Sequence, residues 1–370
     1  MRSPLSKKIQ QVQPSGIRKF FDVAAEMDDV ISLGVGEPDF DTPWRIREEG
    51  IFSLEKSRTF YTSNAGLMEL RVEICKYLER KIHVTYDPKT ETMVTVGGSE
   101  AIDVALRCML DQGDEVLIPQ PSYVSYLPCT IMADGVPVIV DLKHENEFKL
   151  TVEDLEDLVT EKTKVLVLPF PNNPTGSIMT KEDLEPIAAF VEKHDLYVIS
   201  DEIYSELSYQ GEHVSIASLP GMRERTIVIN GFSKGFAMTG WRLGYCCGPH
   251  VIMEQMIKLH QFAIMCAPTT SQYAAVEGLR NCEDEVEEMR KAYNQRRRFL
   301  MHEFARMGLE CFEPFGAFYV FPSIKEFGMT SEEFAERLLM EEKVAVVPGT
   351  AFGESGDCLL YTSPSPRDRG

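Results

Sequence analysis

Between Thr92 and Cys247, short runs of aliphatic and β-branched residues alternate with longer helix-like stretches. The runs are TMVTV, DEVLIP, VPVIVDL, KVLVLPF, LYVISD and TIVING. Strands that are separated by helices favour parallel βαβ units with helices on both faces of the sheet. The alternation therefore predicts an α/β fold built on a mostly parallel sheet.

The segments outside this block have a different pattern. Residues 1–45 hold one short helix-like stretch and the extended run VISLGVGEPDFDTP. Residues 283–307 predict a charged amphipathic helix, which is followed by strand-like GAFYVFP, the helix SEEFAERLLMEE and strand-like KVAVVPG. We expect a smaller α/β domain made from both chain ends (1–45 and 281–357), packed against a larger domain of residues 46–280.

Charge and cysteine content restrict the partners and the compartment. The net charge of −20 over 370 residues argues against nucleic-acid and anionic-membrane partners, which require a positive field. The nine cysteines form no CxxC pair, which is typical of a reducing compartment. No apolar run reaches the roughly 20 residues of a membrane span, and the polar N-terminus lacks the pattern of a signal peptide. We expect a cytoplasmic protein.

The ends of five predicted strands carry polar groups. These ends run into GGSE (97–100), QPSY (120–123), PNNPTG (171–176), DEIY (201–204) and GFSK (231–234). Ligands of open α/β sheets bind beyond the carboxyl ends of the strands, which lie at one edge. The sequence therefore predicts a ligand site at this edge.

A phosphate ester would find suitable partners there. The helix that opens at Ser99 offers free N–H groups, and Gly97 and Gly98 let a ligand come close to the backbone. Arg242, in MTGWRLGY, can add a bidentate charge. A Gly-Gly-Ser turn alone is more often a plain helix start, and a lone arginine is more often a solvated surface group. The prediction of a phosphate site therefore depends on the turn and the arginine occurring together.

An aromatic, electron-withdrawing ring would also find partners. Asp201 ends an apolar strand and would need a cationic partner, such as a protonated pyridine nitrogen. An isolated aspartate in this position is otherwise a helix N-cap. Tyr204 and Asn173 could reach an oxygen on the ring, and Tyr123 could stack on its face. These residues together predict a pyridine-type cofactor.

Lys234 completes the set. It follows a buried-looking strand and precedes the apolar GFAMTGW, a context that would lower the pKa of its amine. An amine with a lowered pKa is a competent Schiff-base nucleophile. Most lysines are solvated surface groups, so the prediction depends on the other candidates that lie on neighbouring strand ends.

These motifs resemble those of the aspartate-aminotransferase superfamily, the fold-type-I, pyridoxal-phosphate-dependent class I/II aminotransferases. The resemblance spans about residues 32–354, nearest the bacterial and archaeal branch that acts on aromatic amino acids, aspartate or alanine. The motifs that carry it are GVGEPDFDTP, YTSNAGLMELR, VTVGGSEAI, PNNPTG, SDEIY and GFSKGFAMTGWRLGY. The resemblance implies a seven-stranded sheet in an α/β/α large domain.

The resemblance also implies a role for each candidate. Lys234 would form a Schiff base with pyridoxal 5′-phosphate and then transfer the proton on the substrate. Tyr61 would reach the phosphate of the partner subunit, which implies a homodimer with active sites at the interface. The further cofactor contacts would be Gly98, Ser99, Tyr123, Asn173, Asp201, Tyr204, Ser233 and Arg242, and the substrate contacts Gly36 and Asn173. No metal site is predicted.

Two positions depart from the family pattern. Many relatives have a serine three residues before the lysine, where this chain has Gly231, and we expect Ser233 to compensate. The family arginine that holds the substrate α-carboxylate would fall near Tyr361, but the match stops at Asp357. We hypothesise that residues 358–370 are not native sequence, because CLLYTSPSPRD reads like a translated sequencing adapter.

The leading hypothesis is an aminotransferase that moves an amino group from an amino acid to a 2-oxo acid by a ping-pong mechanism. A pyridoxal-phosphate-dependent carbon–sulfur β-lyase, or a related elimination enzyme, would share the same cofactor motifs. A third hypothesis is that the chain is a fragment that binds the cofactor but is catalytically impaired, because the family's carboxylate-binding arginine is missing. A regulator with a DNA-binding domain is not expected, because only about 30 residues precede SLGVGEPDF and the charge is negative.

Overall fold

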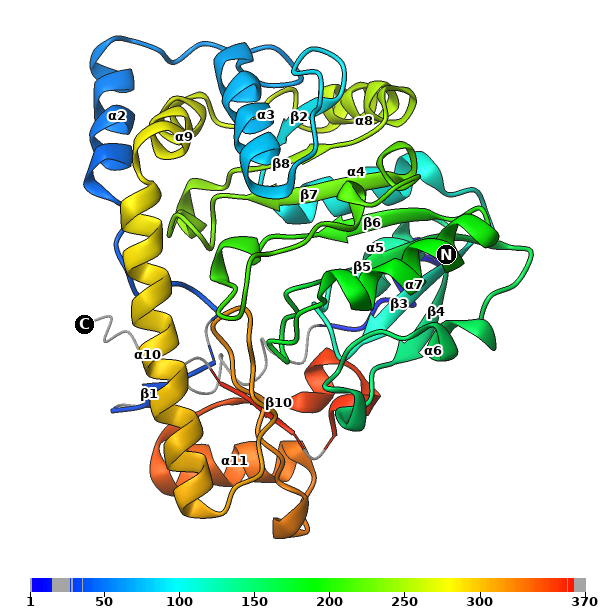
Figure 1. Cartoon of the computed structure of the whole chain (residues 1–370), viewed down its shortest axis with the longest axis vertical. Helices are drawn as coiled ribbons and strands as arrows, with labels where there is room; N and C mark the ends of the chain where they lie inside the picture. Colours follow the sequence, from blue (N-terminus) through cyan, green and yellow to red (C-terminus); the bar gives the residue numbers. More distant parts are fainter. Residues whose placement is uncertain (1, 15–26, 28, 35, 358, 363–370) are drawn as a thin grey trace.

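The computed structural model describes residues 2–14, 27, 29–34, 36–357 and 359–362. A seven-stranded sheet lies at its centre, in the order β2-β8-β7-β6-β5-β3-β4 (Figure 1). Strand β8 is antiparallel to its neighbours β2 and β7, and the remaining neighbours are parallel. The mostly parallel α/β sheet is therefore confirmed. Its strands are β2 (Thr92–Thr95), β3 (Glu115–Gln120), β4 (Val136–Asp141), β5 (Thr163–Leu168), β6 (Tyr197–Asp201), β7 (Thr226–Gly231) and β8 (Gly244–Cys247).

Helices cover both faces of the sheet and enclose two separate hydrophobic cores. Alternate side chains of one strand enter different cores, as the period-two geometry of a strand requires. Cys246 is buried in one core and the adjacent Cys247 in the other, and both are free thiols. One face carries α4 (Gly98–Met109), α5 (Tyr126–Met132) and α8 (His250–Ala263), and the other carries α3 (Met68–Ile82), α7 (Lys181–Lys193) and α9 (Thr269–Asn281). Helix α2 (Trp44–Glu55) packs on α9, and α6 (Val152–Glu156) lies near α7.

The elements from the two ends of the chain lie together below the sheet (Figure 1). The long helix α10 (Glu283–Met307) leads from α9 to this region, where α11 (Ser331–Glu342) lies. Both predicted helices are confirmed. Strand β1 (Ile31–Ser32) pairs with β9 (Val344–Ala345), and β10 (Val347–Pro348) pairs with β11 (Leu360–Tyr361). The proposed domain boundaries stay a prediction.

Local chemistry explains where α10 and α11 begin and end. Helix α10 has three acidic residues in its first turn and ends at Gly308, whose φ of 74° is left-handed. Acidic groups at the start and a left-handed glycine at the end both stabilise a helix. Thr330 and Glu333 form a reciprocal capping box at the start of α11.

The segment GAFYVFP does not form the expected strand. It makes only isolated bridges, such as Val320 with Thr362. Ala317 has a φ of 56°, which breaks the extended backbone that a continuous strand needs. The aromatic side chains of this segment instead pack into the interior, where Phe318, Tyr319 and Phe321 are buried.

The end of the chain is described only in part. Residues 358 and 363–370 lie outside the described residues, so the hypothesis that 358–370 are not native stays a prediction. Residues 359–362 pair with β10 and with the segment around Val320. In the described part of the chain, no helix combines the length and the apolar character needed to cross a lipid bilayer.

Candidate active site

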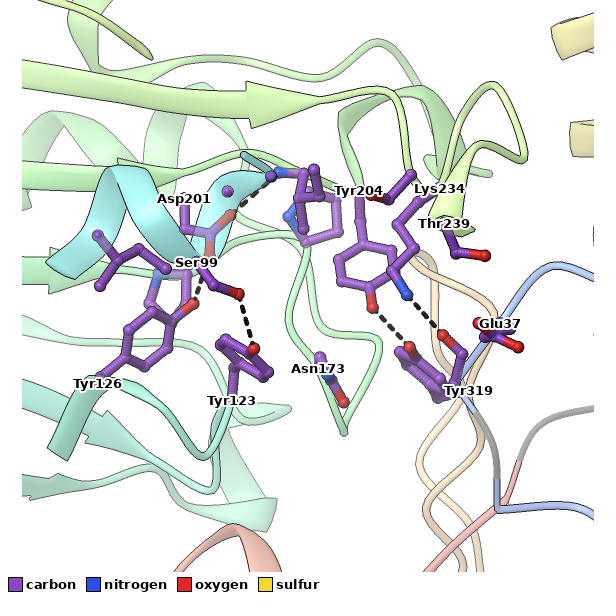
Figure 2. A pocket seen from close by; sticks show the side chains of 18 of the residues that line it. Glu37, Ser99, Tyr123, Tyr126, Asn173, Asp201, Tyr204, Lys234, Thr239 and Tyr319 are labelled. Atoms are coloured by element: carbon purple, nitrogen blue, oxygen red, sulfur yellow. Dashed lines mark hydrogen bonds between the residues drawn. The ribbon is translucent and has the colours of Figure 1, made fainter. Parts of the chain in front are cut away.

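A cavity of about 620 Å³ lies at the carboxyl edge of the parallel strands (Figure 2). The sequence candidates that line it are Gly36, Gly98, Ser99, Tyr123, Asn173, Asp201, Tyr204, Ser233, Lys234 and Arg242. Tyr61 lies outside this lining and is 80% exposed. The fold therefore brings together every candidate that was expected from the same chain.

The turn between β2 and α4 forms one end of the cavity. Gly97 has a φ of 79°, and a Cβ added there would lie 2.9 Å from Nη2 of Arg242. Nη1 of the same guanidinium donates to the carbonyl oxygen of Thr239 at 3.0 Å. Ser99 and Tyr123 share a hydrogen bond of 3.0 Å between their hydroxyls. Helix N–H groups, a hydroxyl and an arginine thus meet at one place, which suits an anion.

Gly231, where many relatives have a serine, lies in close contact with the neighbouring strand. A Cβ at Gly231 would lie 2.9 Å from the Cα of Gly244, because β7 and β8 approach closely there. A side chain at position 231 would force these strands apart. Ser233, two residues on, is nearly buried and lines the cavity. That it compensates for the missing serine stays a prediction.

Asp201 is a buried carboxylate at the end of β6. Its Oδ2 accepts a hydrogen bond from the Tyr126 hydroxyl at 2.7 Å, and its Oδ1 accepts one from the Ile203 N–H at 3.2 Å. Burial raises the pKa of Asp201 to about 6, although these two hydrogen bonds oppose the shift. A buried carboxylate that still needs a counter-charge suits a cationic ring nitrogen.

Lys234 lines the same cavity as Asp201, and its amine points toward the side of Tyr319 (Figure 2). Its Nζ donates to the carbonyl oxygen of Gly36 at 2.5 Å. Burial lowers the pKa of Lys234 to about 8; the Arg242 charge acts in the same direction, and Glu37 acts against it. A substantial fraction of the amine is therefore neutral near pH 8, as a nucleophile requires.

A cluster of three tyrosines closes the end of the cavity next to Lys234. The hydroxyls of Tyr204 and Tyr319 lie 2.5 Å apart, and the rings of Tyr319 and Tyr361 have centroids 4.6 Å apart. A Cβ added at Gly36 would lie 2.7 Å from the Tyr319 hydroxyl and 2.8 Å from that of Tyr361. Burial raises the pKa of Tyr204 well above its ordinary value, so its hydroxyl stays protonated.

Five polar side chains of the lining were not predicted: Glu37, Tyr126, Thr239, Tyr319 and Tyr361. Tyr126 could have been suggested by QPSYVSY, since it follows the candidate Tyr123 by three residues at a helix start. Tyr319 and Tyr361 come from segments outside the sheet, and no local pattern marks them as site residues.

The lining fits a phosphorylated pyridine aldehyde. Oδ1 of Asn173 is buried and has no hydrogen-bond partner among the described residues, so it is available to a ligand in the cavity. The buried Asp201 suits a protonated ring nitrogen, and the Gly97–Ser99 turn with Arg242 suits a phosphate. Lys234 lines the same cavity beside Tyr204, and its amine suits an aldehyde group.

Comparison with known proteins gives a consistent result. Residues 28–360 match the family described as aminotransferase class I and II. YugH, a Bacillus subtilis protein named as an aminotransferase, is 54% identical over 363 residues, which cover 98% of this chain and 94% of that protein. The aspartate aminotransferase of Pyrococcus abyssi is 51% identical over 362 residues, which cover 97% of this chain and 93% of that protein. The crystal structure of the aromatic aminotransferase of Pyrococcus horikoshii has a TM-score of 0.89 and 48% identity, and covers 94% of this chain and 93% of that one.

Proposed function

Because the chain belongs to the class I and II aminotransferases, we propose that it binds pyridoxal 5′-phosphate in this cavity, with Lys234 as the catalytic residue. The observation that carries the proposal is the presence of two buried ionisable groups with shifted pKa values in one cavity. Asp201 needs a cationic partner, and Lys234, with its pKa lowered to about 8, is neutral in a substantial fraction of molecules near pH 8. Groups with perturbed pKa values that line one cavity are typical of catalytic sites.

The residues divide into three tasks in this proposal. Gly98, Ser99 and Arg242 hold the phosphate, while Asp201 keeps the ring nitrogen protonated with Tyr126 as its anchor. Tyr204 and Asn173 bind the ring oxygen. The remaining cofactor contacts are Tyr123, which stacks on the ring, and Ser233, which adds a hydroxyl near the lysine.

Lys234 then acts as the general base and acid of the transfer. When bound, the cofactor supplies an electron sink for breaking the Cα–H bond of the amino acid. The neutral amine of Lys234 would take the proton from Cα of the amino donor and, in the second half of the reaction, would deliver a proton to Cα of the amino acid that is formed from the 2-oxo acid. The carbonyl oxygen of Gly36, which accepts from Nζ at 2.5 Å, helps to orient the amine. The net reaction moves the amino group from an amino acid to a 2-oxo acid.

The described lining favours aromatic or neutral donors over dicarboxylic ones. Its charged members are Glu37, Asp201, Lys234 and Arg242, of which the last three are assigned to the cofactor. Glu37 would repel a second substrate carboxylate, and Tyr319 and Tyr361 offer aromatic surface. The similar proteins act on aspartate or on aromatic amino acids by their names, so a panel of donors against one 2-oxo acid decides between them.

We also propose that the active unit is a homodimer. Phe60, Tyr61 and Phe262 are each at least 80% exposed on the described chain. The segment of Phe60 and Tyr61 lies beside the connection between α8 and α9. The Thr269 hydroxyl donates to the Phe60 carbonyl oxygen at 2.7 Å, and the Asn64 side chain donates to the Met265 carbonyl oxygen at 2.9 Å. A second cavity of about 650 Å³ shares Arg242 with the first and is also lined by Pro268, in this connection. The apolar surface and the shared arginine support a partner subunit whose Tyr61 reaches the phosphate.

Impaired binding of amino acids is a second candidate, supported by one observation. Tyr361 lies in the cavity near the place where the resemblance implies a carboxylate-binding arginine. A phenol can donate one hydrogen bond to a carboxylate but supplies no charge. Full cofactor binding with weak substrate binding would therefore support this candidate.

The free thiols among the described residues support a reducing compartment, and we propose the cytoplasm.

The experiment that tests the main proposal replaces the lysine. Purified protein with pyridoxal 5′-phosphate is expected to be yellow, and Lys234→Ala is expected to lose the lysine-dependent absorption and more than 99% of the transfer rate, because the attachment point and the base are both removed (about 10²-fold or more). The exposed Lys181→Ala is the matched control. A Lys234→Ala spectrum like that of the unmodified protein would assign the cofactor to another lysine.

A further inference from the structure

A glutamate and a histidine lie behind the turn 96–99, outside the cavity. Glu100 is the third residue of α4, directly after Ser99. Its Oε2 accepts a hydrogen bond from the Val96 N–H at 2.5 Å, and its Oε1 lies 2.7 Å from Nδ1 of His260. His260 is in the last turn of α8 and is fully buried. Neither residue was a sequence candidate.

We propose that His260 and Glu100 are positioning residues that fix the turn 96–99 for the phosphate of the cofactor. The proposal rests on the proposed function, because it requires a phosphate at the start of α4. Both residues act through the turn rather than on the ligand, since neither lines the cavity.

The hydrogen bonds define how the pair works. An ionised carboxylate can only accept, so Nδ1 of His260 carries the proton in this bond. One oxygen of Glu100 then holds the backbone just after β2, while the other ties the turn to α8. The turn is also bounded from behind, because a Cβ at Gly244 would lie 2.6 Å from the carbonyl carbon of Gly97. The backbone between Val96 and Ser99 is thus held from two sides.

The negative charge of Glu100 makes its hydrogen-bond partners important for phosphate binding. A carboxylate in the first turn of a helix is attracted by the same free N–H groups that would bind the phosphate. Helix α4 has no side-chain N-cap, so those N–H groups remain available to a ligand. Because both oxygens of Glu100 are already engaged by Val96 and His260, the carboxylate is kept from competing with the phosphate.

The test compares two ligands that differ by the phosphate alone. His260→Leu removes the donor, whereas His260→Asn can place its Nδ2 where Nδ1 of the histidine stood. We expect His260→Leu to weaken pyridoxal 5′-phosphate binding about tenfold, the range of a hydrogen bond to a charged group, and His260→Asn to restore most of the affinity. Binding of pyridoxal, which lacks the phosphate, is expected to be unchanged in both variants.

Controls separate positioning from general stability. His250→Ala, at the exposed start of the same helix, is expected to bind both ligands normally. Urea unfolding of each cofactor-free variant reports the stability of the fold. The ³¹P resonance of the bound cofactor is expected to shift in His260→Leu but not in His250→Ala. If His260→Leu does not fold, Glu100→Gln, which keeps the acceptor for Val96, carries the same comparison.

Two results would overturn the proposal. The first is an unchanged affinity for pyridoxal 5′-phosphate in the folded variant. The second is an equal loss of affinity for pyridoxal 5′-phosphate and pyridoxal that follows the loss of stability. The latter would mean that the pair only braces α4 against α8. Failure of the unmodified protein to bind pyridoxal 5′-phosphate would instead refute the proposed function, so the two failures are distinguishable.

Discussion

Burial of the Asp201 carboxylate carries a cost in stability that a cationic ligand would offset. The carboxylate lies in a desolvated site, and its pKa is raised to about 6. A carboxyl whose pKa is higher in the folded state than in the unfolded state destabilises the fold when it is ionised. This loss of folding stability is complete above pH 6. It disappears as the pH falls below about 4, which is the ordinary pKa of an aspartate. A cationic ring nitrogen would offset it.

Asp201→Asn is therefore expected to stabilise the cofactor-free protein at pH 7 by ~1–3 kcal/mol, since the buried charge is removed. The same variant is expected to bind pyridoxal 5′-phosphate at least tenfold more weakly, because the ring nitrogen loses its counter-charge. Urea unfolding at pH 7 and 4.5, with cofactor titration, measures both effects. The gain in stability should shrink at the lower pH.

The exposed Asp195→Asn is the control for this prediction, and neither quantity is expected to change there. A cofactor-free Asp201→Asn protein that is less stable than the unmodified one at pH 7 would show that the hydrogen bonds from Tyr126 and Ile203 outweigh the cost of burying the charge.

Tyr361 lies near the position at which the resemblance implies a carboxylate-binding arginine. It is buried, lines the cavity and packs against the ring of Tyr319 at a tilt of 42°. Tyr361→Arg is expected to lower the KM for the amino donor about tenfold, because a guanidinium can bind the α-carboxylate with two charged hydrogen bonds. Steady-state kinetics measures this effect.

The visible absorption of the bound cofactor is expected to stay unchanged in Tyr361→Arg, because the cofactor contacts lie elsewhere. Tyr361→Phe, which keeps the ring and removes the hydroxyl, is the matched control. An unchanged KM in Tyr361→Arg, with cofactor bound normally, would argue against a carboxylate site at this position.

At the scale of elements, the close approach of β8 to the β2–α4 turn fixes the geometry of the phosphate end. Gly244 begins β8, and a Cβ added there would lie 2.7 Å from the backbone nitrogen of Gly98. Gly231 on the neighbouring strand is restricted in the same way by Gly244. In this chain, a side chain at either position would require the strand ends or the turn to move.

Gly244→Ala is expected to destabilise the cofactor-free protein by ~1–3 kcal/mol, because the turn must move to admit the methyl group. Affinity for pyridoxal 5′-phosphate should fall as well, since the displaced turn includes Gly98. Thermal or urea unfolding and cofactor titration measure the two effects. Gly240→Ala, at a site with no atom within 4 Å of the new methyl group, should leave the stability nearly unchanged.

At the scale of the whole molecule, the exposed apolar surface around Phe60 and Phe262 bears on assembly. Phe262→Asp is expected to shift the protein from dimer to monomer, because it places a charge in the proposed interface. Cofactor affinity should fall with the dimer, since Tyr61 could no longer reach the phosphate of the other subunit. Analytical ultracentrifugation with cofactor titration checks both.

Phe299→Asp, on the exposed side of α10, is the control and should leave the oligomeric state unchanged. A Phe262→Asp protein that remains dimeric would place the interface elsewhere. A protein that becomes monomeric yet binds cofactor as before would contradict the role proposed for Tyr61.

The sequence by itself determined the sheet and the group of polar residues at its carboxyl edge. The period-two runs place their side chains in two cores, and the carboxyl ends of parallel strands must lie at one edge. Ser99, Asn173, Asp201 and Lys234 therefore had to come together, whatever the detailed packing, and the motifs around them indicated the family.

The tertiary structure decided the substrate end and the supports behind the site. Tyr319, Tyr361 and His260 come from segments far from the strand ends, and no local pattern indicates what a buried aromatic or histidine side chain will contact. The exclusion of a side chain at Gly231 likewise depends on a distance between two strands. Periodicity specifies which face of an element is buried, whereas contacts between distant segments are fixed only when those elements pack together.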